Sequence, residues 1–229
     1  MMNKQWFTRV LLCSLLQAVG SASANAEMVS IRWKSSAPVN WIPGNDFIDG
    51  YTPNFMDGTV EEKGKTKKDG DLEADLIVPK GTTGPIPFVI LMHGCSLLQA
   101  VKPWAQEYAN RFVGAGYGVL VLDSFAPRGV GAGGICADPS QLNWARRRAD
   151  DAYSALDWLI ESGKADPNRV FVLGRSNGGA ASLIVMNKKI GAIQKNKFAG
   201  AFVMQPSCAL MKFVEFYAPV YLHLAERDT

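Results

Sequence analysis

A serine lies at the centre of a segment whose residue types suit a nucleophile. Residues 174–179, Gly-Arg-Ser-Asn-Gly-Gly, follow the apolar run 170–173 and lead into small residues, which predicts a strand, a sharp turn and a helix. On such a turn the Ser176 hydroxyl stands clear of the sheet, where it can attack a carbonyl carbon. The simpler interpretation is a strand-to-helix connection whose serine only caps the helix. We favour the nucleophile because of the flanking segments.

A nucleophile of this kind needs donors for the oxyanion that forms on the attacked carbonyl. Residues 87–92 are continuously apolar, which is typical of a strand buried on both faces, and His93, Gly94 and Cys95 follow them. In the α/β-hydrolase plan, one donor is a backbone N–H just after the His-Gly pair. The other is the N–H of the residue after the nucleophile. This plan assigns the oxyanion hole to the backbones of Cys95 and Asn177.

The other triad members follow the nucleophile in this plan, first the acid and then the histidine. Residues 220–225 predict a strand, and Asp228 lies three residues beyond it, where the acid belongs; the alternative is a surface aspartate in a turn. The sequence has two histidines, and neither fits the base. His93 precedes the nucleophile and braces its loop, and His223 lies within the strand before Asp228. We therefore expect that the chain lacks the segment with the catalytic histidine and is inactive by itself.

These motifs resemble the dienelactone hydrolase family, in particular its exported members, over about residues 72–229. Residues 123–129, Asp-Ser-Phe-Ala-Pro-Arg-Gly, and residues 226–228, Glu-Arg-Asp, add to the resemblance. It implies an α/β-hydrolase fold, hydrolysis of carboxylic esters or lactones through an acyl-enzyme, and no metal or other cofactor. Two features depart from the family. Its founding activity uses a cysteine nucleophile where this chain has Ser176, and its histidine has no counterpart here, so the chain resembles a C-terminally truncated member.

The order of the remaining segments predicts an α/β fold with a doubly wound, largely parallel sheet. Strands are expected at 87–92, 117–123, 170–173, 199–204 and 220–225, and helices at about 103–113 and 140–160. We expect the last strand and helix of the fold to be missing. The segment 27–59 has no clear period and predicts mostly irregular structure. The lysine-rich run 63–68 before Asp69-Gly70 predicts a hairpin with solvated lysines.

The first 26 residues predict a signal peptide. Lys4 and Arg9 precede the apolar stretch 10–19, and an Ala-x-Ala cleavage site ends at Ala26. The apolar stretch is shorter than the about 20 residues that a membrane anchor needs. We therefore expect a mature α/β-hydrolase domain at residues 27–229 that is periplasmic or secreted and has no membrane anchor.

Charge and composition narrow the class of partner. The chain has 24 basic and 21 acidic residues, and removal of the leader makes it nearly neutral. This balance gives no reason to expect nucleic acid. We expect a small-molecule ester or lactone as the partner and leave the oligomeric state open.

The cysteines and arginines of the mature chain admit several pairings. Cys95, Cys136 and Cys208 remain after cleavage, and a bridge between Cys136 and Cys208 is geometrically feasible. Cys95 as a nucleophile is a weaker alternative because it lacks an elbow. Arg128 is expected to pair with Asp123 or Asp150, with a substrate carboxylate as the alternative. The three arginines at 146–148 are interpreted as a solvated helix face that pairs with residues 150 and 151.

Two other functions fit the same residues. A peptidase or acyltransferase on this fold would keep the serine site and differ in its acyl and acceptor pockets. A non-catalytic scaffold or an inactive fragment would keep the fold alone, and the absent histidine favours that alternative.

Overall fold

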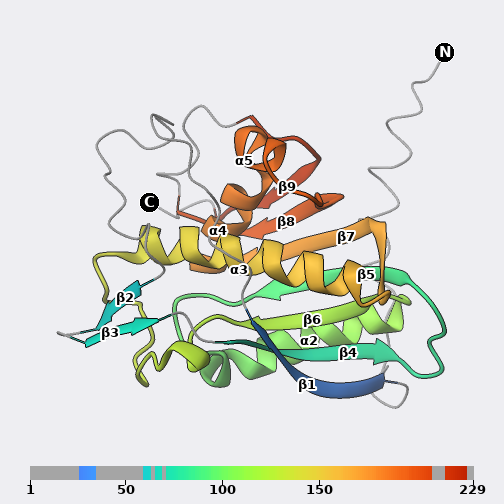
Figure 1. The fold of residues 1–229 in the computed structure, drawn as a ribbon, viewed down its shortest axis with the longest axis horizontal. Helices are drawn as coiled ribbons and strands as arrows, with labels where there is room; N and C mark the ends of the chain where they lie inside the picture. The colour runs from blue at the N-terminus through green and yellow to red at the C-terminus, as the bar shows by residue number, and fades with distance from the viewer. Residues whose placement is uncertain (1–25, 35–58, 63–64, 69–70, 208–214, 226–229) are drawn as a thin grey trace.

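A mixed β-sheet forms the centre of the molecule. The computed structural model describes residues 26–34, 59–62, 65–68, 71–207 and 215–225. Among them the sheet has seven strands in the order β1-β4-β6-β5-β7-β8-β9 (Figure 1). The strands are β1 (Ala26–Lys34), β4 (Asp71–Pro79), β5 (Ile86–Met92), β6 (Gly118–Asp123), β7 (Ala165–Arg175), β8 (Gly200–Met204) and β9 (Val220–His223). The pairs β1·β4 and β4·β6 are antiparallel, and all later pairs are parallel.

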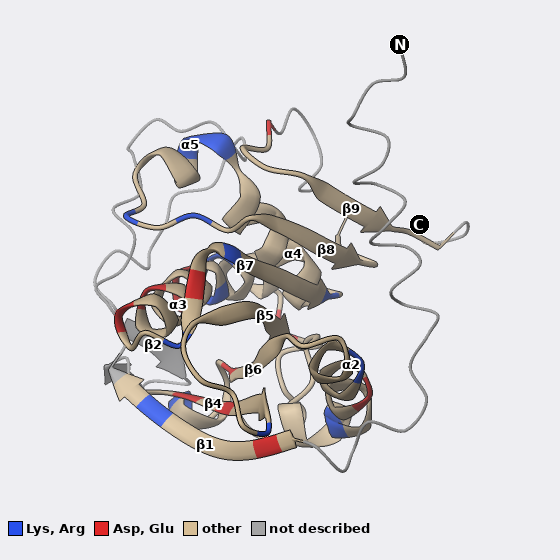
Figure 2. Ribbon diagram, turned by 90° about the vertical axis from the view of Figure 1, so that its right-hand side faces the viewer, with Lys and Arg blue, Asp and Glu red and all other residues tan. Residues whose placement is uncertain are grey.

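Helices cover both faces of this sheet. The helices are α2 (Lys102–Gly114), α3 (Gln141–Glu161), α4 (Asn177–Met186) and α5 (Lys188–Ala192), with 3₁₀ turns η1 (Leu98–Val101) and η2 (Ala126–Arg128). Figure 2 shows α2 and α3 on opposite sides of the sheet. Ala105, Ala109 and Val113 of α2 pack on one face, while α3 and α4 pack on the other. The predicted α/β fold with a largely parallel sheet is confirmed.

Strand β5 illustrates why the central strands are apolar throughout. Successive side chains of a strand point to opposite faces of the sheet. Phe88 and Ile90 belong to the core under α3 and α4, whereas Val89 and Leu91 belong to the core under α2. Both faces are therefore buried, as the continuous apolar run predicts.

Two expectations for the N-terminal part are wrong. Residues 27–34 lie in the segment predicted to be mostly irregular, but together with Ala26 they form β1, which pairs with β4. The predicted hairpin around residues 69–70 is also absent. Strand β3 (Lys65–Lys68) pairs with β2 (Thr59–Glu62) in a separate sheet, and β4 pairs with β1 and β6. Leu72, Ala74 and Leu76 give β4 a buried face in the main sheet.

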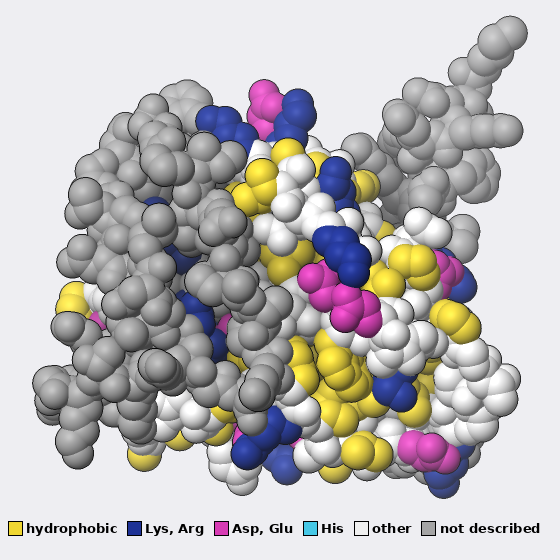
Figure 3. Space-filling view, viewed as in Figure 1, with side chains coloured by type: hydrophobic (Ala, Val, Ile, Leu, Met, Phe, Trp, Pro, Cys, Tyr) yellow, Lys and Arg dark blue, Asp and Glu magenta, His cyan; other side chains and the backbone are white. Residues whose placement is uncertain are grey.

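Several sequence expectations fall outside the described residues. They are the signal peptide up to residue 25, Cys208 and the candidate acid Asp228. Among the described residues, no helix is long and apolar enough to cross a membrane. On the face in Figure 3, basic and acidic side chains lie next to one another. Surface ion pairs such as Lys195–Glu161 agree with that mixing.

Candidate active site

Ser176 occupies a strained turn between β7 and α4. Its backbone has φ 54° and ψ −119°, a region that residues with a side chain rarely adopt. The Ser176 N–H donates to the Met204 carbonyl of β8 (2.8 Å), and the Ser176 carbonyl accepts from the Ala180 N–H (2.9 Å). The side chain is partly exposed. The predicted strand, sharp turn and helix are thus confirmed, with the serine at the apex.

Two glycines make this turn sterically feasible. A Cβ on Gly174 would lie 2.1 Å from the Gly178 carbonyl oxygen. A Cβ on Gly178 would lie 2.1 Å from the Met92 carbonyl oxygen of β5. Side chains at either position would push the helix away from the two strands that hold Ser176.

The end of β5 lies beside the turn. Strands β5 and β7 are parallel with Met92 opposite Gly174, so the residues that follow β5 meet the residues that follow β7. A Cβ on Gly94 would lie 3.5 Å from the Ser176 Cβ. The Cys95 N–H follows Gly94 directly. The Asn177 N–H is the first of helix α4, where backbone donors have no acceptor within the helix.

A disulfide joins Cys95 to Cys136, 41 residues later in the chain. The Ile135 N–H also donates to the Cys95 carbonyl (2.8 Å), so the loop after β5 is tied to the loop before α3. This pairing excludes the alternative of a bridge between Cys136 and Cys208, because Cys136 already pairs with Cys95. A half-cystine has no thiolate, which also removes Cys95 as a nucleophile.

In the part of the chain described, neither histidine ring makes a hydrogen bond with the Ser176 hydroxyl. The ring of His93 is fully buried, with Nδ1 3.0 Å from the Gly94 carbonyl oxygen and an edge-to-face contact to Phe125 at 5.0 Å. Burial, and then the charge of Arg148, lower the pKa of His93 to about 3, so the ring is neutral at physiological pH. His223 is exposed in β9, and its carbonyl accepts from the Gln205 N–H (2.9 Å).

Arg148 lies under the site, contrary to the solvated helix face predicted for residues 146–148. Its side chain is completely buried. It donates to the carbonyls of His93 (2.6 Å) and Gly94 (3.2 Å) and to Asn177 Oδ1 (3.0 Å). Burial lowers the pKa of Arg148 to about 10, and the nearby charges of Asp151 and Asp123 oppose that shift. The side chain is therefore charged at neutral pH.

A second buried arginine completes this polar layer. Arg128 forms a bidentate ion pair with Asp151, with N–O distances of 2.8 and 2.7 Å, and also donates to the Ser124 carbonyl (2.6 Å). The two side chains are 2% and 0% exposed. The ion pair forms with Asp151 and not with the predicted partners Asp123 or Asp150. Because the Arg128 side chain is buried, it is not accessible to a substrate carboxylate.

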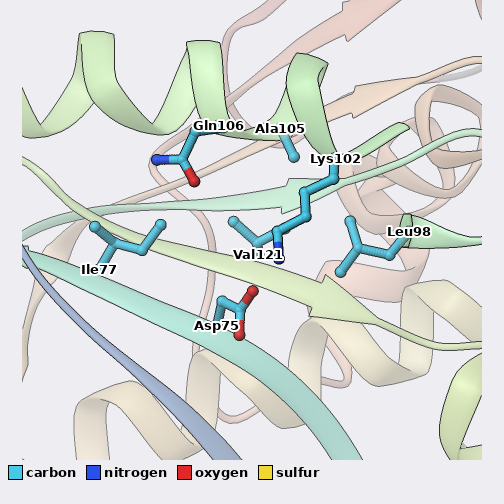
Figure 4. Close-up of a pocket in the computed structure, with 7 residues that line it drawn as sticks. All are labelled: Asp75, Ile77, Leu98, Lys102, Ala105, Gln106 and Val121. Carbon is cyan, nitrogen blue, oxygen red and sulfur yellow. The ribbon is translucent and has the colours of Figure 1, made fainter. Parts of the chain in front are cut away.

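A pocket lies on the face of the sheet that α2 covers. It is lined from β4, β6, η1 and α2, and its polar lining residues are Asp75, Lys102 and Gln106 (Figure 4). None of its lining residues belongs to the Ser176 turn or to the loop after β5. Among the described residues, no cluster of three His, Cys, Asp or Glu side chains could hold a metal ion.

Comparison with known proteins places the chain in a family. Residues 106–225, which are 120 of the 229 residues, match the prolyl oligopeptidase family. The chain belongs to this family. Dipeptidyl aminopeptidase BIII of Pseudoxanthomonas mexicana is 30% identical over 105 residues, covering 43% of this chain and 14% of that protein. The acylamino-acid-releasing enzyme of Arabidopsis thaliana is 26% identical over 129 residues, covering 56% of this chain and 16% of that protein. The chain thus spans a small part of these relatives' lengths.

Solved structures share the fold of this prolyl oligopeptidase family member. A dienelactone hydrolase-like promiscuous phosphotriesterase, P91, from metagenomic libraries has a TM-score of 0.55 at 17% identity, covering 89% of this chain and 70% of that one. A structure named m3DLH has a TM-score of 0.50 at 18% identity, covering 80% and 60%. The predicted resemblance is confirmed at the level of the α/β-hydrolases. The chain has the α/β-hydrolase fold, and part of its sequence is similar to a dipeptidyl aminopeptidase.

Proposed function

We propose that this protein is a serine hydrolase that cleaves carboxylic esters or lactones through an acyl-enzyme on Ser176. The observation that carries the proposal is the backbone of Ser176. Ser176 is a partly exposed residue with a positive φ at the apex of the turn, and Gly94, which precedes Cys95, lies against its side chain. We infer that the backbone N–H groups of Cys95 and Asn177 face the attacked carbonyl.

The proposed reaction follows from these positions. The Ser176 oxygen attacks the carbonyl carbon and gives its proton to a base, and the former carbonyl oxygen becomes an oxyanion. The N–H groups of Cys95 and Asn177 donate to that oxygen, and the N-terminal end of α4 favours negative charge there. The carbon–oxygen bond to the leaving group then breaks, and the departing alkoxide takes up the proton. Water attacks the acyl-enzyme in the same manner and releases the acid.

The base in this proposal is a histidine that Asp228 orients. It is neither His93, which is buried and neutral, nor His223, which lies on β9. Loss of the triad histidine lowers turnover on the order of a millionfold in a serine protease. An oxyanion hole and substrate binding alone still leave a rate ~10³-fold above that in water. Esters are therefore expected to acylate Ser176 slowly but measurably even without help from this base.

We also propose that the protein is exported. The sequence of residues 1–26 has the pattern of a cleaved leader, and the Cys95–Cys136 disulfide suits an oxidising compartment. Expression in a Gram-negative host should give a periplasmic or secreted protein that begins at Glu27. An intact Met1 on most of that pool would contradict the proposal.

Acyl transfer from an activated ester tests the catalytic proposal. The chain is incubated with p-nitrophenyl acetate, quenched in acid and analysed by intact-mass spectrometry and peptide mapping. We expect one acetyl group on Ser176 in the wild-type chain and in Ser162→Ala, which removes a hydroxyl at the far end of α3. Ser176→Ala should carry none. Equal acetylation of Ser176→Ala would contradict the nucleophile assignment.

A peptidase is the second candidate, and the family match favours it. The names of both curated relatives describe a peptidase, one a dipeptidyl aminopeptidase and one an acylamino-acid-releasing enzyme, and they share part of their sequence with this chain. A peptidase would use the same serine but must protonate an amine leaving group. Dipeptidyl and acylaminoacyl p-nitroanilides, assayed beside p-nitrophenyl esters, separate the two. Ser176-dependent cleavage of an anilide at a kcat/KM comparable to that of the esters would favour the peptidase.

A further inference from the structure

Arg148 contacts both backbone segments that flank the Ser176 turn. Its two terminal nitrogens make three hydrogen bonds, to the carbonyl oxygens of His93 and Gly94 after β5 and to the side chain of Asn177 in α4. These segments are distant in sequence from each other and from α3, which carries Arg148. One rigid guanidinium therefore fixes the position of one segment relative to the other.

The contact with Gly94 acts on the Cys95 donor through the peptide plane. The Gly94 carbonyl and the Cys95 N–H belong to one planar trans peptide, so they point in opposite directions. An arginine N–H that is hydrogen-bonded to the Gly94 oxygen therefore fixes the direction of the Cys95 N–H, which points the opposite way from the same peptide. The same hydrogen bond polarises the peptide and makes that N–H a stronger donor.

The contact with Asn177 acts on the second donor. The Asn177 side chain accepts from Arg148 and donates to the Gln141 carbonyl at the start of α3 (2.8 Å). Asn177 is also the first residue of α4, and as a whole residue it is 5% exposed. Anchoring it on both sides fixes the first turn of α4 and the direction of the Asn177 N–H.

The burial of Arg148 separates this role from substrate contact. Its side chain has no exposed surface, and its guanidinium lies 4.8 Å from the centre of the Phe125 ring. Burying a guanidinium is costly, and an apolar residue of similar size often serves stability as well or better. An apolar residue could not make the three hydrogen bonds that Arg148 makes to His93, Gly94 and Asn177.

We propose that Arg148 is a positioning residue that sets the geometry of the oxyanion hole by holding the Gly94–Cys95 peptide and the Asn177 side chain together. This inference rests on the proposed function, because it needs the Cys95 and Asn177 N–H groups to bind an oxyanion. Arg148 is fully buried, and the hydrogen bonds described for it reach the Ser176 turn only through the segments after β5 and at the start of α4.

The test compares an ester with a thionoester in the full 229-residue chain. In the thionoester, sulfur replaces the carbonyl oxygen; the longer C=S bond and the weaker acceptor make its hydrolysis depend less on the two donors. Arg148→Met and Arg148→Lys are assayed against Arg147→Lys, a change on the same helix. We expect kcat for p-nitrophenyl acetate to fall ~10- to 100-fold in Arg148→Met, because small misplacements at a reacting centre cost that much. KM and the thionoester rate should change little.

A further variant tests the same contact while keeping Arg148 in place, so that misfolding caused by the loss of the arginine cannot explain its effect. Asn177→Ala removes one of the three Arg148 bonds and keeps the backbone N–H, so it should lower the ester-to-thionoester ratio in the same direction by a smaller factor. Circular dichroism identifies any variant that fails to fold. Equal losses for ester and thionoester, or no loss in folded Arg148→Lys and Asn177→Ala, would overturn the inference.

Failure of the proposed function gives a different result. Residual catalysis by an oxyanion hole does not require the serine, so the Arg148 variants are also compared in a Ser176→Ala background. A lower ester-to-thionoester ratio there, together with acetylation that does not depend on Ser176, would refute the nucleophile and keep the positioning role.

Discussion

Replacing Asp151 with asparagine should destabilise the protein strongly. The change keeps the shape of the side chain and removes only its charge. Asp151 is 0% exposed and is held by both terminal nitrogens of Arg128. Its charge also opposes the effect of burial on the pKa of Arg148. Asp151→Asn therefore leaves the buried positive charges of Arg128 and Arg148 with less nearby negative charge to stabilise them.

The expected loss of unfolding free energy in Asp151→Asn follows from the burial of the ion pair. Removing one partner of a buried ion pair costs about 3–5 kcal/mol, because the other charge stays desolvated and unpaired. For a domain of about 200 residues, each kcal/mol lowers Tm by roughly 2–4 °C. The midpoint of Asp151→Asn should therefore lie roughly 6–20 °C below that of the wild type.

The assay is thermal unfolding followed by circular dichroism, with a urea titration at 25 °C. The matched control is Lys195→Gln, which breaks the exposed ion pair with Glu161. Exposed pairs contribute little, so this control should leave the midpoint unchanged. A shift for Asp151→Asn no larger than that of the control would refute the buried network.

Three further predictions concern the same region. His93 has a pKa of about 3 in the folded chain against 6.5 ordinarily, so its contribution to stability is complete above pH 6.5 and is lost as the pH falls towards 3. Between pH 7 and 5 the wild type should lose about 2 kcal/mol more unfolding free energy in urea than His93→Gln; parallel pH curves would argue against a buried neutral ring. Changing Cys95 and Cys136 together to serine should lower stability by about 4 kcal/mol from loop entropy, and an unchanged urea midpoint would contradict the bridge. Added imidazole should speed p-nitrophenyl acetate hydrolysis more for the wild type than for Ser176→Ala, since it supplies a base that neither histidine provides; equal acceleration would count against the site.

The turn around Ser176 was predictable because its signals are local. A buried strand, two glycines and a run of small residues are adjacent in sequence, and each has a steric role in the turn. The loop after β5 was predictable for the same reason. The order of strands and helices then brings both to the carboxyl edge of the sheet.

The polar layer under the site was missed because it depends on tertiary packing. Three arginines followed by two aspartates suggest a solvated helix face when only neighbours in sequence are considered. The spacing held a signal, since Arg148 lies three residues after Ala145, four before Ala152 and eight before Leu156, all fully buried. These spacings place Arg148 on the same helix face as the three buried residues. Reading the helix by spacing alone, without regard to charge, would have predicted a buried Arg148.

Strand β1 and the Cys95–Cys136 bridge also depend on distant partners. The sequence of Ala26–Lys34 alone did not identify a strand, and the strand is defined by its pairing with β4. The bridge joins two loops that meet only after β5 and α3 have packed.

The central claim is that Ser176 is the nucleophile, and a fluorophosphonate probe tests it most directly. Such probes phosphonylate activated serines, with the phosphoryl oxygen in the oxyanion hole. The chain is incubated at high probe concentration for long times, and the modified peptide is identified by mass spectrometry. We predict a single adduct on Ser176, formed slowly, present in Ser162→Ala and absent from Ser176→Ala. An adduct on another residue, or the same labelling of the Ser176→Ala chain, would contradict the account.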